Sequence, residues 1–296
     1  MILHDDVSKR ITGESRRQNN RFLYRLRTAN AWLLAFGLNI RDFVTGLRGF
    51  PRFVLQYFLL RRQVARQGPP VRVRFTMPQL SDRFAEGGTA RGHYFHQDLY
   101  VARKIHERNP RKHVDIGSRI DGFVAHVAAF RPVEVFDVRP VASNVKNIQF
   151  RQMDFAGDIS GLNGYSDSVS CLHALEHFGL GRYGEPLDVR GHLKGFENLT
   201  RILKKGGILY LSVPIGPERI DFNAHRVFDM STILGLAGNS FNLVAFSFVD
   251  DAGDFHEDVK MTENDRGSNF GCHYGCGIFE FKKRGKGGDR GRSPSA

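Results

Sequence analysis

Acidic residues end three successive apolar segments of the chain. Asp115 lies in HVDIGSRIDGF (113–123), Asp137 ends EVFD, and Asp154 follows in QMDF. Each segment has the length of a buried strand, so the three acids would meet at the carboxyl edge of a parallel sheet, where α/β proteins bind ligands. The spacing therefore predicts a negatively charged ligand cleft.

The turn after the first segment suits close approach of a ligand. Gly117 lets the backbone come near a bound molecule, and the following helix start supplies free N–H groups. A dinucleotide fingerprint would need glycine where Arg119 stands, and a P-loop would need Lys-Ser/Thr after Gly122, so both phosphate-binding patterns match weakly. Asp115 instead favours a cationic ligand, and Asp137 is spaced to accept hydrogen bonds from ribose hydroxyls.

The run His173-Ala-Leu-Glu176-His177 could support two kinds of chemistry. In an acceptor site, His173 would be the first choice for a general base, with Glu176 or His177 orienting it and His225 closing the site. The run also matches H-x-x-E-H, in which two histidines bind zinc and the glutamate activates water. Since no third ligand at suitable spacing is evident, we favour the acceptor site and expect no metal.

The chain has three cysteines, Cys171, Cys272 and Cys276. A disulfide scaffold would need more, and three leave one unpaired, so a reducing compartment such as the cytoplasm is expected. Cys272 and Cys276 form a CxxxC pair, but without a second pair we interpret them as small buried thiols.

Strand and helix patterns alternate through the centre of the chain, which predicts βαβ units and a mostly parallel sheet. We therefore expect an α/β fold with a doubly wound, Rossmann-like sheet of seven strands. The expected strands are 113–116, 133–136, 148–153, 168–172, 208–213, 241–248 and 277–282, and the expected helices are 96–107, 122–130, 193–203 and 228–236.

The N-terminal region carries an apolar stripe at helical spacing, from Ile40 to Phe58, with arginines largely on the other side. Its apolar run is too short to span a membrane. Residues 30–66 could form an interfacial helix that contacts an anionic membrane, or a helical extension packed on the main domain. Gln67–Pro70 has the composition of a linker.

Charge divides the chain into an acidic centre and two basic flanks. Residues 1–112 carry a net charge of +14, residues 113–281 of −7 and residues 282–296 of +5. We expect a basic helical extension (1–70), a catalytic domain (71–281) and a disordered tail (282–296). Because the core is acidic and lacks a basic, aromatic strand surface, nucleic acid is not the expected partner.

The ordered runs VDIGSRIDGF, EVFDV, QMDF, DSVSCLHALEHF and LKKGGILYLSVP resemble the motifs of class I S-adenosylmethionine-dependent methyltransferases. In that family the first motif cradles the methionine part of the cofactor, the second acid holds the ribose, and the third bonds the adenine amino group. The resemblance implies S-adenosyl-L-methionine as cofactor. The residues carried over are Asp115, Gly117, Ser118 and Gly122, then Asp137, then Asp154 and its neighbour Phe155.

More narrowly, YFHQDLYVARKI, HALEHFGLGRYG and HRVFD resemble an uncharacterised methyltransferase-like family, catalogued as a domain of unknown function, over roughly residues 75–281. Its bacterial members accompany cell-surface polysaccharide synthesis. The resemblance implies O-methylation of a glycan or another small acceptor. Two other interpretations stay open: a non-catalytic cofactor-binding protein on the same fold, and a zinc-dependent hydrolase acting through HALEH.

Overall fold

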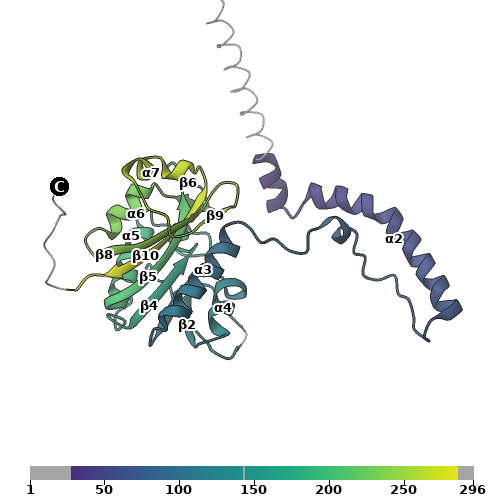
Figure 1. Ribbon diagram of the computed structural model, residues 1–296, viewed down its shortest axis with the longest axis horizontal. Helices are drawn as coiled ribbons and strands as arrows, with labels where there is room; N and C mark the ends of the chain where they lie inside the picture. Colours follow the sequence, from purple (N-terminus) through teal and green to yellow (C-terminus); the bar gives the residue numbers. More distant parts are fainter. Residues whose placement is uncertain (1–27, 143, 286–296) are drawn as a thin grey trace, which may run out of the picture. The chain divides into compact units, whose positions relative to one another are not determined.

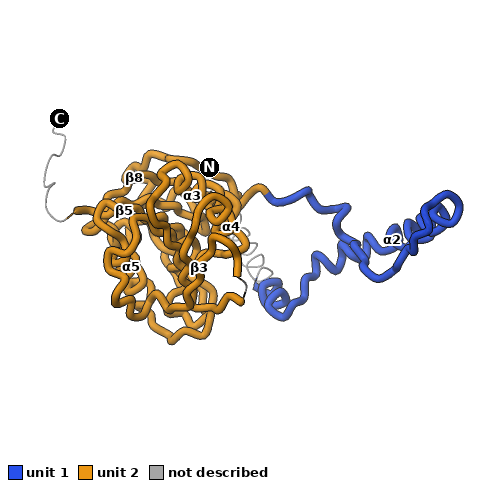
Figure 2. The backbone as a smooth tube through the Cα atoms, turned by 90° about the horizontal axis from the view of Figure 1, so that it is seen from below, with its two compact units in different colours: residues 1–89 blue, residues 90–296 orange. Residues whose placement is uncertain are grey.

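The computed structural model describes residues 28–142 and 144–285 (Figure 1). The chain divides into two compact units, residues 1–89 and 90–296 (Figure 2). The division falls after Thr89 rather than near residue 70. Most of the expected tail, from residue 286 onward, lies outside the described residues, and its first two residues extend the last strand of the sheet.

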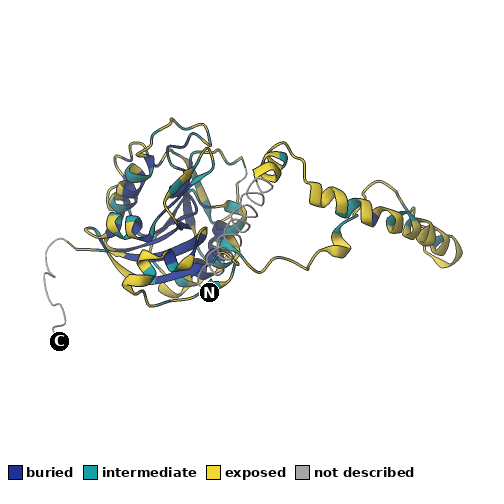
Figure 3. Ribbon diagram, turned by 90° about the horizontal axis from the view of Figure 1, so that it is seen from above, coloured by how far each residue is buried: buried dark blue, intermediate teal, exposed yellow. Residues whose placement is uncertain are grey.

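The first unit is built on one long helix, α2 (Ile40–Gln67). The Asn39 side chain accepts a hydrogen bond from the backbone N–H of Asp42, which satisfies one free donor at the helix start. The helix continues through Pro51, and most of its length is exposed (Figure 3). Among the described helices, none combines the length and hydropathy needed to cross a membrane.

The segment after α2 runs back along it. Phe75 packs against Phe53 and Tyr57, and Leu80 lies against Gly49, one turn nearer the helix start. A Cβ on Gly49 would lie 1.9 Å from the Leu80 carbonyl oxygen, so this approach requires glycine. The predicted apolar stripe is therefore partly covered by residues of the same unit.

The second unit contains an eight-stranded sheet in the order β3-β2-β1-β4-β5-β10-β8-β9. The doubly wound, Rossmann-like fold is confirmed, with one strand more than the seven expected; the additional strand is a two-residue edge, too short to show a pattern in the sequence. Strands β1 to β5 are parallel, whereas β10 is antiparallel to both of its neighbours. The strands are β1 (His113–Ile116), β2 (Val133–Asp137), β3 (Ile148–Gln152), β4 (Ser166–Leu172), β5 (Leu203–Ile215), β8 (Phe241–Val249), β9 (Phe255–His256) and β10 (Gly275–Lys283).

The strand order reverses between β1 and β4. From β1 the sheet grows toward β3, and from β4 it grows the other way toward β5. In a parallel sheet this reversal separates the loops that leave the two central strands and opens a crevice at their carboxyl ends.

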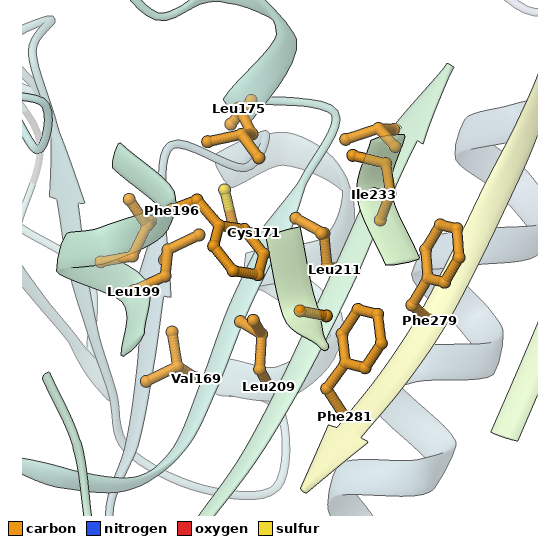
Figure 4. Close-up of a cluster of buried hydrophobic side chains, with 14 of the residues drawn as sticks. Val169, Cys171, Leu175, Phe196, Leu199, Leu209, Leu211, Ile233, Phe279 and Phe281 are labelled. Carbon is orange, nitrogen blue, oxygen red and sulfur yellow. The ribbon is translucent and has the colours of Figure 1, made fainter. Parts of the chain in front are cut away.

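Apolar side chains alternate along the central strands and form a core on each face of the sheet. Leu209 and Leu211 of β5 face one core with α5 (Gly191–Ile202) and α6 (Met230–Ala237), as Figure 4 shows. Ile208 and Tyr210 face the other, with α3 (His93–Arg108) and α4 (Ala125–Ala128). Successive residues of β5 thus point to opposite faces of the sheet, and the apolar side chains on both faces are buried.

The expected helix at 122–130 is wrong in part. Gly122 has non-helical angles (φ −122°, ψ −105°), so the segment is a single π turn, η2 (Ile120–Val124), followed by the four-residue α4. The sequence pattern did not predict several short elements. One lies in the first unit, η1 (Asp82–Phe84). The others lie in the second unit: η3 (Leu175–His177), β6 (Arg219–Asp221), β7 (His225–Val227), α7 (Glu263–Gly267) and η4 (Asn269–Gly271).

Candidate functional site

A cavity of about 510 Å³ lies at the carboxyl ends of β1, β2, β3 and β4. It occupies the crevice that the reversal of strand order opens. Its lining comes from the loops after these strands and from Tyr94 near the start of α3. The predicted site residues that line it are Gly117, Ser118, Asp137, Asp154, Phe155, His173 and His177.

The turn after β1 is held from below by Asp115. The buried Asp115 carboxylate accepts hydrogen bonds from the Ser118 N–H (3.1 Å) and hydroxyl (2.6 Å), and the Ser118 hydroxyl oxygen accepts one from the Leu172 N–H. Gly117 takes φ +71°, and a Cβ there would lie 3.0 Å from the Ala174 Cβ. Asp115 therefore braces the loop and does not itself line the cavity.

Burial raises the pKa of Asp115 to about 6, although its hydrogen bonds to Ser118 and Ser170 favour the ionised form. The Ser170 hydroxyl donates to Asp115, so its oxygen is free to accept a hydrogen bond from Nε2 of the buried His113 ring at 3.1 Å. The second ring nitrogen of His113 contacts the Ser168 hydroxyl at 2.9 Å. A polar network thus runs beneath the cavity, through β1 and β4.

Asp137, at the end of β2, is paired with Arg139. The Arg139 guanidinium donates to both carboxylate oxygens, at 3.0 and 2.6 Å, and its backbone N–H donates a third bond at 2.8 Å. Arg139 also lies over the Tyr183 ring, 4.6 Å from its centroid. Arg139 and Tyr183 both line the cavity, so Asp137, the predicted ribose-binding carboxylate, faces the site while it is paired with a cation.

Asp154 and Phe155 follow β3 at the cavity wall. The exposed Asp154 carboxylate accepts a hydrogen bond from the Ala156 N–H, and the buried Phe155 packs near Phe136, with ring centroids 6.1 Å apart. The Asn198 amide of α5 donates to the Phe155 carbonyl oxygen and fixes this loop. The wall therefore offers one carboxylate beside apolar rings.

The HALEH run forms a tight turn instead of a helical face. His173 lies directly after β4 with φ +49°, and its N–H donates to the Ser212 carbonyl oxygen. Its Nδ1 is 2.7 Å from Glu176 Oε1, and its buried Nε2 has no hydrogen-bond partner within the described residues. His177 Nδ1 bonds the Ala224 carbonyl oxygen instead (2.7 Å).

These contacts separate the protonation states of the three groups. Burial would raise the pKa of Glu176, but the adjacent His173 brings it below its ordinary value. Burial would lower the pKa of His173, but the neighbouring Cys276 and Glu176 raise it above its ordinary value. Burial lowers the pKa of His177, so that ring is neutral at neutral pH.

Several predicted residues lie outside the cavity lining. Glu176 is buried behind His173, and Gly122 contacts Asp98, whose Oδ2 would lie 2.5 Å from a Cβ on that glycine. His225, on β7, pairs with Asp221 at 3.4 Å, and its ring lies 6.5 Å from that of His177. His225 is therefore near the site without lining it.

The cavity also contains residues that the sequence did not single out. Tyr94, Arg119, Arg139, Arg182 and Tyr183 line it. Arg139 stands two residues after Asp137, so its position at the cavity could have been predicted from that spacing. Tyr94 comes from α3, which precedes the sheet, and no local pattern indicates that it reaches the cavity.

A sequence profile described as "Caenorhabditis protein of unknown function, DUF268" matches residues 139–269, which is less than half of the chain. None of the curated proteins matches the sequence. The matched region includes Asp154 and the HALEH run but not the β1 turn.

Three solved structures illustrate the structural similarity. A putative sarcosine dimethylglycine methyltransferase from Galdieria sulphuraria has a TM-score of 0.45 at 13% identity, covering 64% of this chain and 86% of that one. The N-methyltransferase NodS from Bradyrhizobium japonicum, in complex with S-adenosyl-L-homocysteine, gives 0.43 at 14% over 77% and 97%. The 1,6-didemethyltoxoflavin-N1-methyltransferase from Burkholderia thailandensis, also with S-adenosylhomocysteine bound, gives 0.47 at 12% over 83% and 91%. The fold assignment rests on the strand order itself.

Proposed function

We propose that the second unit binds S-adenosyl-L-methionine and transfers its methyl group to an acceptor. The observation that supports this best is the single cavity in which a glycine turn, Asp137 and Asp154 lie together with the HALEH residues. Such a cavity has one region suited to a nucleoside and another suited to a reacting group.

The residues present fit the proposed cofactor. Asp137 would accept hydrogen bonds from the ribose hydroxyls, either beside Arg139 or after that guanidinium has moved. Asp154 would bond the adenine amino group, with Phe155 and Phe136 against the ring. Gly117 and Ser118 would offer backbone to the methionine part, since the turn has no side chain at Gly117 to block it.

The cofactor supplies an activated methyl group on a sulfonium. The acceptor atom attacks the methyl carbon, the carbon–sulfur bond breaks toward sulfur, and a hydroxyl acceptor must lose its proton. Among the HALEH residues, His177 fits the role of proton acceptor best. Its Nδ1 carries the proton that the Ala224 carbonyl accepts, which leaves a lone pair on Nε2.

His173, the first choice from sequence, fits this role less well. Its Nδ1 is engaged by the Glu176 carboxylate at 2.7 Å, and its other ring nitrogen, Nε2, is buried. A general base must reach the proton that it removes, and a buried nitrogen is poorly placed for this. We therefore assign the base to His177, with Glu176 as a positioning residue between the two histidines.

The proposed acceptor is a hydroxyl of a glycan or another small molecule, in keeping with the resemblance to proteins of polysaccharide synthesis. Tyr94 and Tyr183 present aromatic rings to the cavity, and Arg182 lies over the Tyr183 ring. Aromatic faces beside hydrogen-bonding cations suit a sugar ring, particularly one that carries an acidic group.

Calorimetry with S-adenosylhomocysteine tests the cofactor site. Asp137→Ala should weaken binding by about 1.5–3 kcal/mol, and toward the lower end because Arg139 already competes for the carboxylate. Asp158→Ala is the matched control, because that exposed carboxylate bonds Ser160 away from the cavity. Equal affinity of both variants and the wild type would overturn the ribose assignment.

Turnover requires a separate assay. Labelled S-adenosylmethionine, presented with pooled glycan, lipid and small-molecule acceptors, should yield a labelled product detected by mass spectrometry. Tight cofactor binding without transfer to any pool would favour the non-catalytic alternative.

A further inference from the structure

We propose that His93, His173 and Cys276 form a binding site for a divalent transition metal, with zinc the best fit. One ligand atom from each residue lies within 4.8 Å of the other two. The three residues come from separate parts of the second unit: the start of α3, the residue after β4 and the start of β10. The site is independent of the proposed methyl transfer.

The His173 side chain carries the strongest indication of a ligand. It is 4% exposed, and its Nε2 has no hydrogen-bond partner within the described residues. A buried polar atom left without a partner is costly, and native structures rarely retain one. A metal ion bound at Nε2 would remove that cost.

The surroundings of His173 match those of a metal-binding histidine. Its other nitrogen, Nδ1, is 2.7 Å from the Glu176 carboxylate, which is 1% exposed. Histidines that bind metals usually donate this second N–H to a carboxylate or carbonyl, which orients the ring and raises its basicity. Glu176 thus has a role here that differs from water activation in the H-x-x-E-H pattern.

The donor set selects the class of metal. One thiolate and two imidazoles favour zinc or a similar soft-to-borderline ion over magnesium or calcium, which prefer oxygen. The Cys276 side chain is fully buried and His93 is half-buried, stacked on His173 with ring centroids 5.2 Å apart. Zinc bonds of about 2.0–2.3 Å would require the ligand atoms to close by roughly 1 Å, which is within side-chain movement.

Three protein ligands leave one position of a tetrahedral zinc open. His173 also lines the large cavity, so the site adjoins the region that we assign to the acceptor. A water molecule would occupy the open position. The proposal differs from the sequence-based expectation of no metal and of two small buried thiols, and Cys272 is not among the three clustered residues.

Cobalt spectroscopy on the tag-free full chain tests the proposal. After treatment with a chelator, titration with Co²⁺ should produce a thiolate-to-cobalt charge-transfer band that saturates at one equivalent, and Zn²⁺ should displace it. Elemental analysis of protein purified without chelator should find zinc near one per chain. A full Co²⁺ titration without a thiolate band would overturn the site, and the cluster would then be a thiol–imidazole pair.

Matched variants identify the ligands. Cys276→Ser should abolish the band, whereas Cys272→Ser, which removes another buried thiol nearby, should retain it. Glu176→Gln should keep the band but weaken the metal affinity about 10–100-fold, as loss of a second-sphere partner does. Retention of the band in Cys276→Ser with loss in Cys272→Ser would contradict the assignment.

Folding of the variants is checked separately. Each is compared with the wild type by thermal melting and S-adenosylhomocysteine binding in the presence of chelator. If Cys276→Ser does not fold, the wild-type titration still decides whether a thiolate binds the metal. Failure of methyl transfer leaves the band unchanged, so the two proposals can fail separately.

Discussion

His173 and His177 lie in one turn of the chain, yet their hydrogen bonds suit them to different chemistry. His173 Nδ1 bonds the Glu176 carboxylate, whereas His177 Nδ1 bonds the Ala224 carbonyl oxygen. Burial disfavours the charged form of His177 and lowers its pKa, so His177 is neutral at neutral pH. Two histidines four residues apart thus suit different roles, His173 as a ligand and His177 as a base.

This difference predicts the behaviour of His177→Asn. Methyl transfer should fall about 10²–10⁴-fold, as expected on loss of a general base, while S-adenosylhomocysteine affinity changes little. Since a base acts unprotonated and burial lowers the pKa of His177, the wild-type rate should stay high as pH falls to 6.5 and decline only below it. Initial rates across pH check this.

The exposed His106, at the far end of α3, provides the control for that experiment. His106→Asn should leave both the rate and its pH profile unchanged. If the pH profile of His177→Asn keeps the wild-type inflection, however slow the variant is, then another group is the base.

The buried His113 predicts a component of acid sensitivity. Burial lowers its pKa from 6.5 to about 3. Between these values the unfolded chain binds a proton that the folded chain does not, so the free energy of unfolding falls by up to about 1.4 kcal/mol per unit of decreasing pH. Asp115, with its pKa raised to about 6, acts in the opposite direction, so its contribution is lost as pH rises through 6.

Comparison of variants isolates the His113 term. Urea unfolding at several pH values should give a shallower acid slope for His113→Gln than for the wild type, whereas exposed His106→Gln should retain the wild-type slope. Parallel slopes in all three proteins would contradict a neutral buried ring at position 113.

The sequence predicted the cavity residues unevenly, and the reason is physical. Asp137 and Asp154 line the cavity, because the end of a strand fixes where the following residues lie. Asp115 has a different place from the one expected, because its carboxylate turns inward to Ser118. Cys276 and His93 meet His173 only through packing of distant segments, which no local spacing reports.

At the scale of elements, α2 has large apolar side chains that the rest of its unit leaves exposed. Phe43 is 68% exposed, Phe50 50% and Phe58 59%, while Phe53 and Tyr57 are packed on Phe75. Arginines are interspersed, and Asp42 is the one acidic residue of the helix. We propose that this surface binds an anionic membrane, where apolar burial and cation attraction act together.

Co-sedimentation of the full chain with anionic vesicles tests this proposal. The wild type should pellet, and Phe43→Ser combined with Phe50→Ser should stay largely in solution, since burial contributes about 25 cal/mol per Å². Phe222→Ser removes an 87% exposed ring from the second unit and should pellet like the wild type. Pelleting that ignores both the double change and added salt would contradict the proposal.

At the scale of the whole molecule, the division after Thr89 predicts that the second unit folds alone. A piece starting at Ala90 contains the whole sheet, both cores and the cavity. Its unfolding should be cooperative, and its S-adenosylhomocysteine affinity should lie within about twofold of the full chain's, as for an independent domain. Aggregation of this piece, with the full chain monomeric, would show that residues 1–89 complete the core.

Strand β10 is the last strand in the sequence but lies inside the sheet, between β5 and β8. During synthesis the ribosome must therefore release the chain through Lys283 before the sheet can close, and until then β5 and β8 expose unpaired edges. A nascent chain that stops before Gly275 would lack the buried Phe279 and Phe281 that join the two halves of one core. Cys276 arrives with the same strand, so capture of the proposed metal would follow the pairing of β10 with β5 and β8.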